Sequence, residues 1–398
     1  MKRIVYLSVV LALMALNGAA QNISGSWAGT LDLQAYQLPL VFHITDDGSC
    51  TWDSPMEKVR DIPAEIVYLS PDSICLTTSI GFTYEGRLQE GVIHGTFTQS
   101  GMSFPLDLKP INRPQTPQPP FPYQTEEVKF HNPKAGATLA GTLTTPEGAR
   151  CVLLMVTGSG IQNRDEEIMS HKPFAVIADR LARQGIATLR YDDRGYGESV
   201  GGEVINATTR DFADDAMAGI EWLRQSGRFQ QVGILGHSEG GSIAFMLGGQ
   251  GLVDFIVSLA GPTVQGDTLL LEQNRLIAGE LAKDLTIEVL RRDPRIQQNP
   301  WYSFFMDYNP QTDIAKITCP VMAINGEKDT QVACEMCLDA LRRALPANAH
   351  HLVKSYPGLN HLFQHCETGM PNEYGIIEET MSEDVINDII TWIKGLND

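Results

Sequence analysis

Residues 231–241 read Gln231-Val232-Gly233-Ile234-Leu235-Gly236-His237-Ser238-Glu239-Gly240-Gly241. The run starts with apolar residues that are typical of a buried strand, and an Ala- and Gly-rich helical pattern follows it. Between the two lies Gly-x-Ser-x-Gly, a pattern that places a serine on a sharp, strained turn from strand to helix. Side chains two residues before and after that serine would collide with neighbouring backbone, which explains Gly236 and Gly240. The stretch therefore predicts an exposed Ser238 hydroxyl at a helix amino terminus, where the dipole favours developing negative charge.

Strand and helix patterns alternate on both sides of this turn, over residues 124–398. The expected strands are 151–156, 186–191, 232–235, 255–259, 321–324 and 351–356, and the expected helices are 173–184, 210–225, 332–345 and 378–396. Two more strands within 123–145 form a leading hairpin. Buried apolar strands separated by helices indicate an α/β fold with a doubly wound, mostly parallel sheet.

A serine hydroxyl becomes a good nucleophile only when a base takes its proton. On this fold the chain order is serine, acid, histidine, which leaves His350, His351, His361 and His365 as bases. The first two belong to the last expected strand, whereas His361 follows the turn after it. Because catalytic groups lie on loops at the carboxyl ends of strands, we expect His361 to be the base and His365 to be a neighbour.

The acid should follow an earlier strand, and the loop Gly326-Glu327-Lys328-Asp329 does so. We expect Asp329 to accept the His361 N–H, to fix its tautomer and to stabilise the imidazolium. Glu327 is the competing carboxylate, and a surface salt bridge is the structural alternative for either.

An oxyanion hole needs two backbone N–H groups. One is expected from Glu239, directly after the nucleophile, and the other from Ser159 in the loop Thr157-Gly158-Ser159-Gly160. This loop matches neither the dinucleotide fingerprint nor a phosphate-binding loop, because the further Gly and the Gly-Lys-Ser/Thr are missing.

These motifs resemble the α/β-hydrolase superfamily, and within it bacterial carboxylesterases of the serine-aminopeptidase-like, S33-type branch. The matching stretches, in the family's chain order, are 158–166, 190–199, 236–241, 325–332 and 358–363. The resemblance covers about 125–398 and implies Ser238 as nucleophile, Asp329 as acid, His361 as base, and Ser159 with Glu239 as oxyanion donors. It also implies that Arg164 and Asp165 tie down the oxyanion loop. Thr157 departs from the family, in which many members carry His at this structural position.

About 55 residues separate the strand 255–259 from the strand that begins near 321, and we expect a helical cap at about 263–316. Within it, the aromatic residues Trp301, Phe304 and Phe305 are candidates for an acyl or aryl pocket. Packing inside the cap is the alternative for them.

The amino-terminal region contains three further parts. Residues 1–20 have a secretory signal layout: two positive charges, an apolar run and small residues before Gln21. The run is about 13 residues, shorter than the roughly 20 that span a bilayer, so we expect cleavage after Ala20 rather than a retained anchor. Residues 22–109 show the alternation of a small antiparallel β domain or partial barrel, and its opening Gly25-Ser26-Trp27 resembles lipocalin-like proteins. Residues 110–123 contain six prolines and predict an extended linker.

Composition and net charge limit the classes of binding partner. The 398 residues include 43% hydrophobic and 20% charged residues, which is ordinary for a globular protein, and the net charge is −18. Loss of Lys2 and Arg3 with the signal would make the charge −20. The acidic surplus argues against nucleic acid and against docking on anionic membranes. Cys334 and Cys337 form a C-x-x-C within an expected helix, which favours buried structural thiols over a redox pair or a zinc site with His365 or Cys366.

The sequence thus predicts an exported, periplasmic or extracellular serine hydrolase that cleaves small-molecule carboxylic esters through an acyl-enzyme, with no metal or organic cofactor. The enzymatic alternative is an aminopeptidase or amidase with the same triad and an acidic anchor at Glu272, Glu280 or Asp307. The other alternative is an inactive binding protein that uses its β domain.

Overall fold

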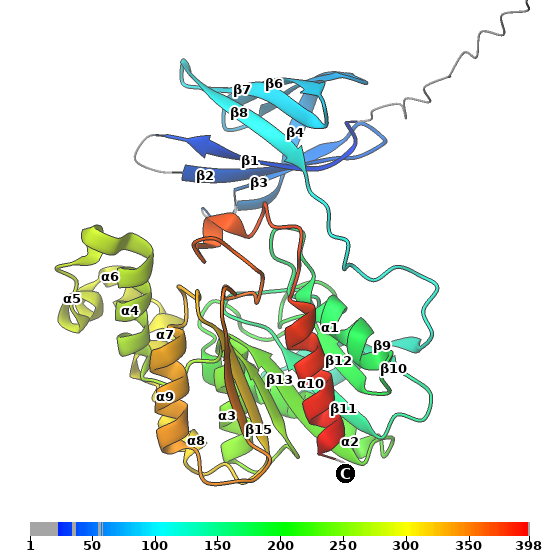
Figure 1. Ribbon diagram of the computed structural model, residues 1–398, viewed down its shortest axis with the longest axis vertical. Helices are drawn as coiled ribbons and strands as arrows, with labels where there is room; N and C mark the ends of the chain where they lie inside the picture. The colour runs from blue at the N-terminus through cyan, green and yellow to red at the C-terminus, as the bar shows by residue number, and fades with distance from the viewer. Residues whose placement is uncertain (1–22, 34–36, 55–56, 58, 397–398) are drawn as a thin grey trace, which may run out of the picture. The chain divides into compact units, whose positions relative to one another are not determined.

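The computed structural model describes residues 23–33, 37–54, 57 and 59–396. The chain divides into two compact units, one up to Ile111 and one from Asn112 onward. Each unit has its own sheet and core (Figure 1). The signal expected at 1–20 lies outside the described residues.

The first unit is a closed antiparallel barrel of eight strands. The strands are β1 (Gly25–Asp32), β2 (Gln37–Ile44), β3 (Cys50–Ser54), β4 (Val59–Ser70), β5 (Ser73–Thr78), β6 (Phe82–Gln89), β7 (Val92–Gln99) and β8 (Met102–Pro110). Each strand pairs with the next, and β1 closes the barrel against β8 through the Trp27–Pro110 and Ala28–Lys109 pairs. Closure leaves no free sheet edge within the unit.

Aromatic side chains fill the barrel interior. Phe42 stacks on Tyr84, and Phe82 packs edge-on against Trp52. The Tyr84 hydroxyl lies within hydrogen-bond distance of two backbone carbonyls on neighbouring strands. A Cβ at Gly95 would come within 2.4 Å of that hydroxyl, so this glycine makes room for the ring. The interior thus has the close packing of a protein core.

The second unit is built on an eight-stranded sheet in the order β16-β15-β14-β13-β11-β12-β10-β9. Its strands are β9 (Gln124–Asn132), β10 (Ala137–Thr145), β11 (Cys151–Val156), β12 (Ala187–Tyr191), β13 (Gln231–His237), β14 (Ile256–Leu259), β15 (Val321–Gly326) and β16 (Leu352–Tyr356). The strands from β11 to β16 run parallel, and β9 and β10 form an antiparallel edge. The predicted fold class is therefore confirmed.

The strand order reverses between β11 and β13, which lie side by side. Val156, the last residue of β11, pairs with Gly236 in β13. The two loops that leave these strands must therefore start next to each other. Such a switch point is where open α/β sheets bind their ligands.

Helices cover both faces of the sheet (Figure 1). The two layers are α1 (Pro173–Ala182) with α10 (Glu383–Gly395) on one face, and α2 (Thr209–Gln225), α3 (Glu239–Gly249) and α9 (Cys334–Ala344) on the other. Each layer buries its own apolar cluster against alternate side chains of the strands. None of the helices in the described part of the chain has the length and apolar character that a bilayer crossing requires.

Between β14 and β15 the chain forms a helical insertion. It contains α4 (Gly266–Ala278), the 3₁₀ turn η2 (Gly279–Ala282), α5 (Ile287–Arg292), α6 (Pro294–Gln297), α7 (Pro300–Asp307) and α8 (Gln311–Ile314). This is the region for which the sequence predicts a cap.

The proline-rich segment from residue 112 is held by the second unit. The Arg113 guanidinium donates to the carbonyls of Met169, Gly375 and Ile377 at 2.8–3.0 Å. Gln115 accepts from the Thr380 N–H at 2.6 Å. Arg113 and Gln115, in the first half of the predicted linker, are therefore held by hydrogen bonds to the rest of the second unit.

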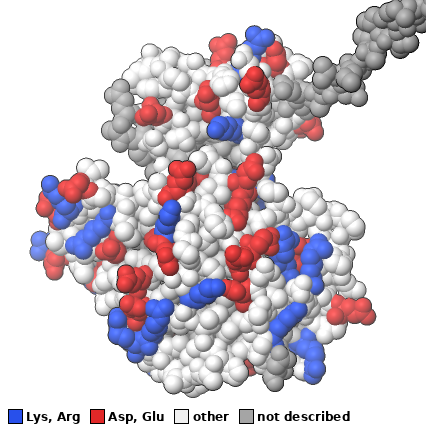
Figure 2. Space-filling model, in the orientation of Figure 1, with Lys and Arg blue, Asp and Glu red and all other residues white. Residues whose placement is uncertain are grey.

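Charged side chains of both signs are interspersed on the face shown in Figure 2. The seven cysteines are all free. Burial raises the pKa of most of these thiols, as for Cys50 to about 11.

Candidate active site

Ser238 lies at the turn from β13 into α3 in a strained conformation. Its φ is 52° and its ψ is −119°, values that non-glycine residues rarely adopt. A Cβ at Gly236 would stand 2.0 Å from the Gly240 carbonyl oxygen, and one at Gly240 would stand 2.1 Å from that of Val156. Both glycines are therefore required for the sharp turn. The strain presents Ser238 at the amino terminus of α3.

Asp329 and His361 come together at the carboxyl ends of β15 and β16. Asp329 Oδ2 lies 2.7 Å from His361 Nδ1, and both side chains are buried. The other carboxylate oxygen accepts the Gln331 and Val332 N–H groups at 2.8 and 2.9 Å. The turn after β15 thus holds the Asp329 carboxylate in the orientation in which its second oxygen contacts the His361 ring.

The competing residues have other partners. Glu327 accepts from the Ser355 hydroxyl at 2.8 Å, and His365 is paired with Glu379. No hydrogen bond joins Ser238 to His361 in the described part of the chain. Catalytic hydrogen bonds of this kind are often long without substrate and shorten when it binds.

The two expected oxyanion donors lie on the adjoining loops of β11 and β13. Glu239 is the first residue of α3, in the turn where N–H groups lack intrahelical acceptors. In the other loop the Gly158 N–H is bound to the Glu166 carboxylate at 2.7 Å, and Ser159 follows in an exposed position. A Cβ at Gly158 would lie 3.1 Å from that of Ser238, so this loop passes directly against the serine.

A second acid–histidine pair lies beside the first. Glu166 Oε1 is 2.8 Å from His237 Nδ1, and His237 Nε2 is 3.0 Å from the backbone carbonyl of His361. Burial lowers the pKa of His237, but Glu166 and the hydrogen bonds outweigh it and the pKa is raised. Both residues lie in stretches that resemble the family, 158–166 and 236–241, but the sequence assigns neither of them a role, because His237 precedes the serine in the chain and Glu166 is far from it.

The Glu239 side chain is also buried, next to the nucleophile. Burial raises its pKa, and hydrogen bonds oppose that rise. One of them comes from the cap: Trp301 Nε1 donates to Glu239 Oε1 at 2.7 Å. The cap is thereby linked to the residue that follows Ser238.

The three aromatic pocket candidates have different surroundings. Trp301 stacks on Phe305 with ring centroids 5.1 Å apart, and Phe305 is buried in a small apolar cluster of the cap with Leu269 and Val332. Phe304 packs instead against the main core. Of the three, Trp301 is the residue that contacts the turn around Ser238, through its hydrogen bond to Glu239.

Arg164 and Asp165 anchor the loop after β11. The Arg164 guanidinium donates two hydrogen bonds to Asp192, at 2.8 and 3.1 Å, and it also contacts Glu127 and Glu198. Asp165 pairs with Arg190 in β12. These contacts hold the loop to the neighbouring strands.

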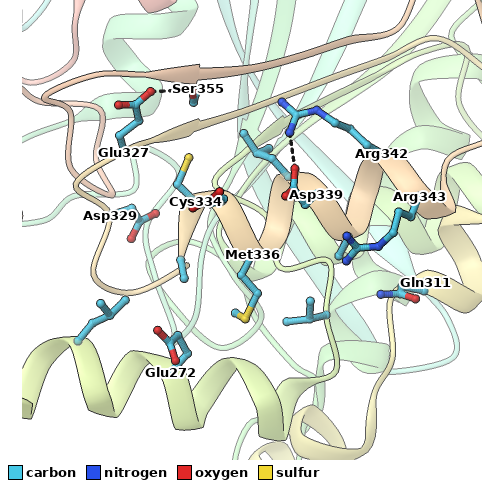
Figure 3. A pocket seen from close by; sticks show the side chains of 16 residues that line it. Glu272, Gln311, Glu327, Asp329, Cys334, Met336, Asp339, Arg342, Arg343 and Ser355 are labelled. Atoms are coloured by element: carbon cyan, nitrogen blue, oxygen red, sulfur yellow. Dashed lines mark hydrogen bonds and ion pairs between the residues drawn. The ribbon is translucent and has the colours of Figure 1, made fainter.

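A cavity of about 960 Å³ lies between the cap and α9. Figure 3 shows Asp329 and Cys334 at one end of it and Glu272 of α4 across from them. Ser238 and the three aromatic residues do not line this space. Among the described residues, no group of three or more His, Cys, Asp or Glu is placed to hold a metal ion.

Comparisons with known proteins agree with this architecture. Residues 169–310 match the family model described as "Serine aminopeptidase, S33". The chain is 27% identical over 321 residues to the esterase EstD of Thermotoga maritima, covering 77% of this chain and 74% of EstD. It is 23% identical over 244 residues to a monoacylglycerol lipase of Mycolicibacterium smegmatis, covering 54% and 81%.

Among solved structures, the fold is similar to that of the hypothetical protein PA2218 from Pseudomonas aeruginosa. The TM-score is 0.50 at 16% identity, and the match covers 70% of this chain and 97% of the other. The strand order, the serine turn and these relatives together show that the second unit has the α/β-hydrolase fold.

Proposed function

We propose that this protein is a serine hydrolase that cleaves small-molecule carboxylic esters, with Ser238, His361 and Asp329 as its catalytic triad. The observation that carries the proposal is the buried Asp329–His361 pair at 2.7 Å, on a sheet that presents Ser238 on a strained elbow. The two curated relatives are an esterase and a lipase, so ester hydrolysis is the activity class that the comparisons support.

In the proposed reaction His361 takes the Ser238 proton as the oxygen attacks the ester carbonyl. The N–H groups of Glu239 and Ser159 stabilise the resulting oxyanion. His361 then gives its proton to the departing alkoxide, which leaves as the alcohol, and Ser238 is acylated. Water, deprotonated by His361, attacks the acyl-enzyme and releases the acid with Ser238 restored.

The test compares the wild type with Ser238→Ala on short p-nitrophenyl esters and on aminoacyl nitroanilides. We expect ester turnover that the substitution abolishes, and fluorophosphonate labelling of Ser238 alone. Ser103→Ala, which changes an exposed serine of the barrel, is the matched control and should keep full activity. Turnover confined to the anilides would contradict the ester assignment, and an unlabelled wild type would favour a binding protein that uses the barrel.

The peptidase alternative has one observation in its favour. Of its three candidate anchors, Glu272 lines the cavity that Asp329 also lines. Asp307 is engaged with Arg291 at 2.7 Å instead. If a free α-amine binds in this cavity, Glu272→Gln should raise KM for the anilides and leave the esters unchanged.

We also propose that the protein is exported, on the signal layout of residues 1–20. Amino-terminal sequencing of the protein from its native host should give Gln21 as the first residue. A mature protein that retains Met1 in the cytoplasm would refute export without affecting the catalytic proposal.

A further inference from the structure

The reaction leaves one buried acid–histidine pair unused. Glu166 and His237 are 1% and 5% exposed, and 2.8 Å separates Oε1 from Nδ1. A buried charge is costly unless it is paired, so two such groups beside the nucleophile call for an explanation.

The partners of His237 define its protons. The carbonyl oxygen of His361 can only accept, so the 3.0 Å contact requires a hydrogen on His237 Nε2. Glu166 Oε1 already accepts the Gly158 N–H at 2.7 Å, which fits an ionised carboxylate and a hydrogen on His237 Nδ1 as well. A ring with hydrogens on both nitrogens is an imidazolium.

This pair joins the three segments that the reaction needs. Glu166 holds the peptide N–H of Gly158, next to the expected donor Ser159. His237 directly precedes Ser238 in the chain, and its Nε2 holds the backbone of His361. The His237 and His361 rings lie 4.6 Å apart, so a shift of one would move the other.

We infer that Glu166 and His237 form a positioning pair, which holds the base loop and the oxyanion loop in register with Ser238. The pair does not touch the reacting atoms, and the inference rests on the triad proposed above. A misplacement of about 1 Å in such a site can cost up to about 100-fold in rate, so a pair of this kind is expected to affect kcat.

The charge state gives the pair a distinct pH dependence. His237 faces Glu166, Asp329 and the His361 ring, and burial lowers its pKa while the two carboxylates raise it above the usual value. The imidazolium therefore persists to higher pH than that of an ordinary histidine. As the pH rises through this raised pKa, His237 loses one of its two N–H groups, and activity should fall on the alkaline side.

The first test substitutes Glu166→Gln, which keeps an oxygen for Gly158 and removes the charge. We expect kcat to fall about 10- to 100-fold with KM little changed, because the loss lies in the transition state. The alkaline limb of the pH–activity profile should also move to lower pH. Without the Glu166 charge, the lowering of the His237 pKa by burial is no longer offset. The matched control is Glu167→Gln, the adjacent and partly exposed carboxylate, which should follow the wild-type profile.

A second readout does not depend on catalysis. Proton NMR of ¹⁵N-histidine-labelled protein should show both ring N–H groups of His237 in the wild type and in Ser238→Ala, and one of them should disappear in Glu166→Gln. A Glu166→Gln enzyme that is less stable but has unchanged kcat and pH profile would show a merely structural pair and overturn the inference. Failure of the triad proposal would look different: the wild type would be inactive and unlabelled while the His237 signals remained.

Discussion

The two acid–histidine pairs of this protein are built from the same groups at nearly the same distance, yet they differ at one atom. Asp329–His361 and Glu166–His237 span 2.7 and 2.8 Å, and all four side chains are buried. His237 uses its second ring nitrogen on a carbonyl, whereas His361 Nε2 has no hydrogen-bond partner in the described part of the chain. A histidine with a free nitrogen can take and return a proton; one with both nitrogens engaged can only hold its neighbours.

A third buried histidine shows what the carboxylate contributes. His171 Nδ1 and Nε2 contact the Thr380 hydroxyl and the Tyr374 carbonyl, and burial with nearby Arg113 lowers its pKa to about 3. His237 is equally buried, but Glu166 raises its pKa. The partner, rather than burial, therefore decides whether a buried histidine carries charge.

The largest expected effect comes from the pair with the free nitrogen. Asp329→Asn keeps the shape but places an amide where the carboxylate fixes the His361 tautomer, and kcat should fall by about 10⁴-fold. Glu327→Gln, on the same loop and bonded to Ser355, is the control and should stay within about twofold. Steady-state kinetics on a p-nitrophenyl ester measure both. A loss for Asp329→Asn no greater than for Glu166→Gln would remove the distinction between the two pairs.

Gly158→Ala tests the point where the Glu166–His237 pair meets the nucleophile. The added methyl would lie 3.1 Å from Ser238 Cβ, 3.3 Å from Glu166 Oε1 and 3.6 Å from His237 Nδ1. Since Ser238 and Glu166 must shift by a few tenths of an ångström, we expect kcat to fall by about 10- to 100-fold. Gly395→Ala, where the added methyl meets nothing within 4 Å, is the control. Wild-type kinetics in Gly158→Ala would show that the oxyanion loop tolerates displacement.

The histidine without a carboxylate should make the fold sensitive to acid. In the unfolded chain His171 binds a proton near its ordinary pKa of 6.5, whereas in the folded protein it stays neutral down to about 3. Stability is therefore intact above pH 6.5 and falls as the pH drops toward 3, by about 2 kcal/mol at pH 5. Urea unfolding at pH 7 and pH 5 should show a smaller loss for His171→Gln. The exposed His350→Gln should lose as much as the wild type. An equal loss in all three proteins would contradict the neutral His171.

How far the sequence could predict this molecule depended on whether the signal was local. The elbow and its glycines lie within a few residues, and the buried strands of the second unit have a continuous apolar pattern, so the fold and the position of Ser238 could be predicted. In the barrel, β3 and β4 have a weaker alternating pattern than the other strands. β3 is short, and β4 carries Asp61, Pro63 and Glu65 and a register shift at Ile66, which interrupt the alternation.

The Glu166–His237 pair shows the same limit inside the active site. The two residues are 71 positions apart, and Glu166 lies in a loop with positive φ and no repeating pattern. The chain order of the triad predicts a base after Ser238, so it gives no role to His237, which directly precedes the serine. The contact between His237 and Glu166 depends on the pairing of β11 with β13, which no local sequence pattern shows.

The smallest expected effect concerns Glu239, the third buried carboxylate near Ser238. Its partner is the indole N–H of Trp301, whereas Asp329 and Glu166 are each paired with an imidazole. Trp301→Phe removes the donor at 2.7 Å from Glu239 and keeps a ring to stack on Phe305. Because a neutral donor contributes less than a charged partner, we expect kcat/KM to fall only about two- to fivefold, corresponding to less than about 1 kcal/mol. Trp392→Phe on α10, which loses the indole hydrogen bond to the His350 carbonyl, should leave kcat/KM unchanged. A loss as large as that of Glu166→Gln would mean that the cap, through Glu239, positions the nucleophile as strongly as the second acid–histidine pair does.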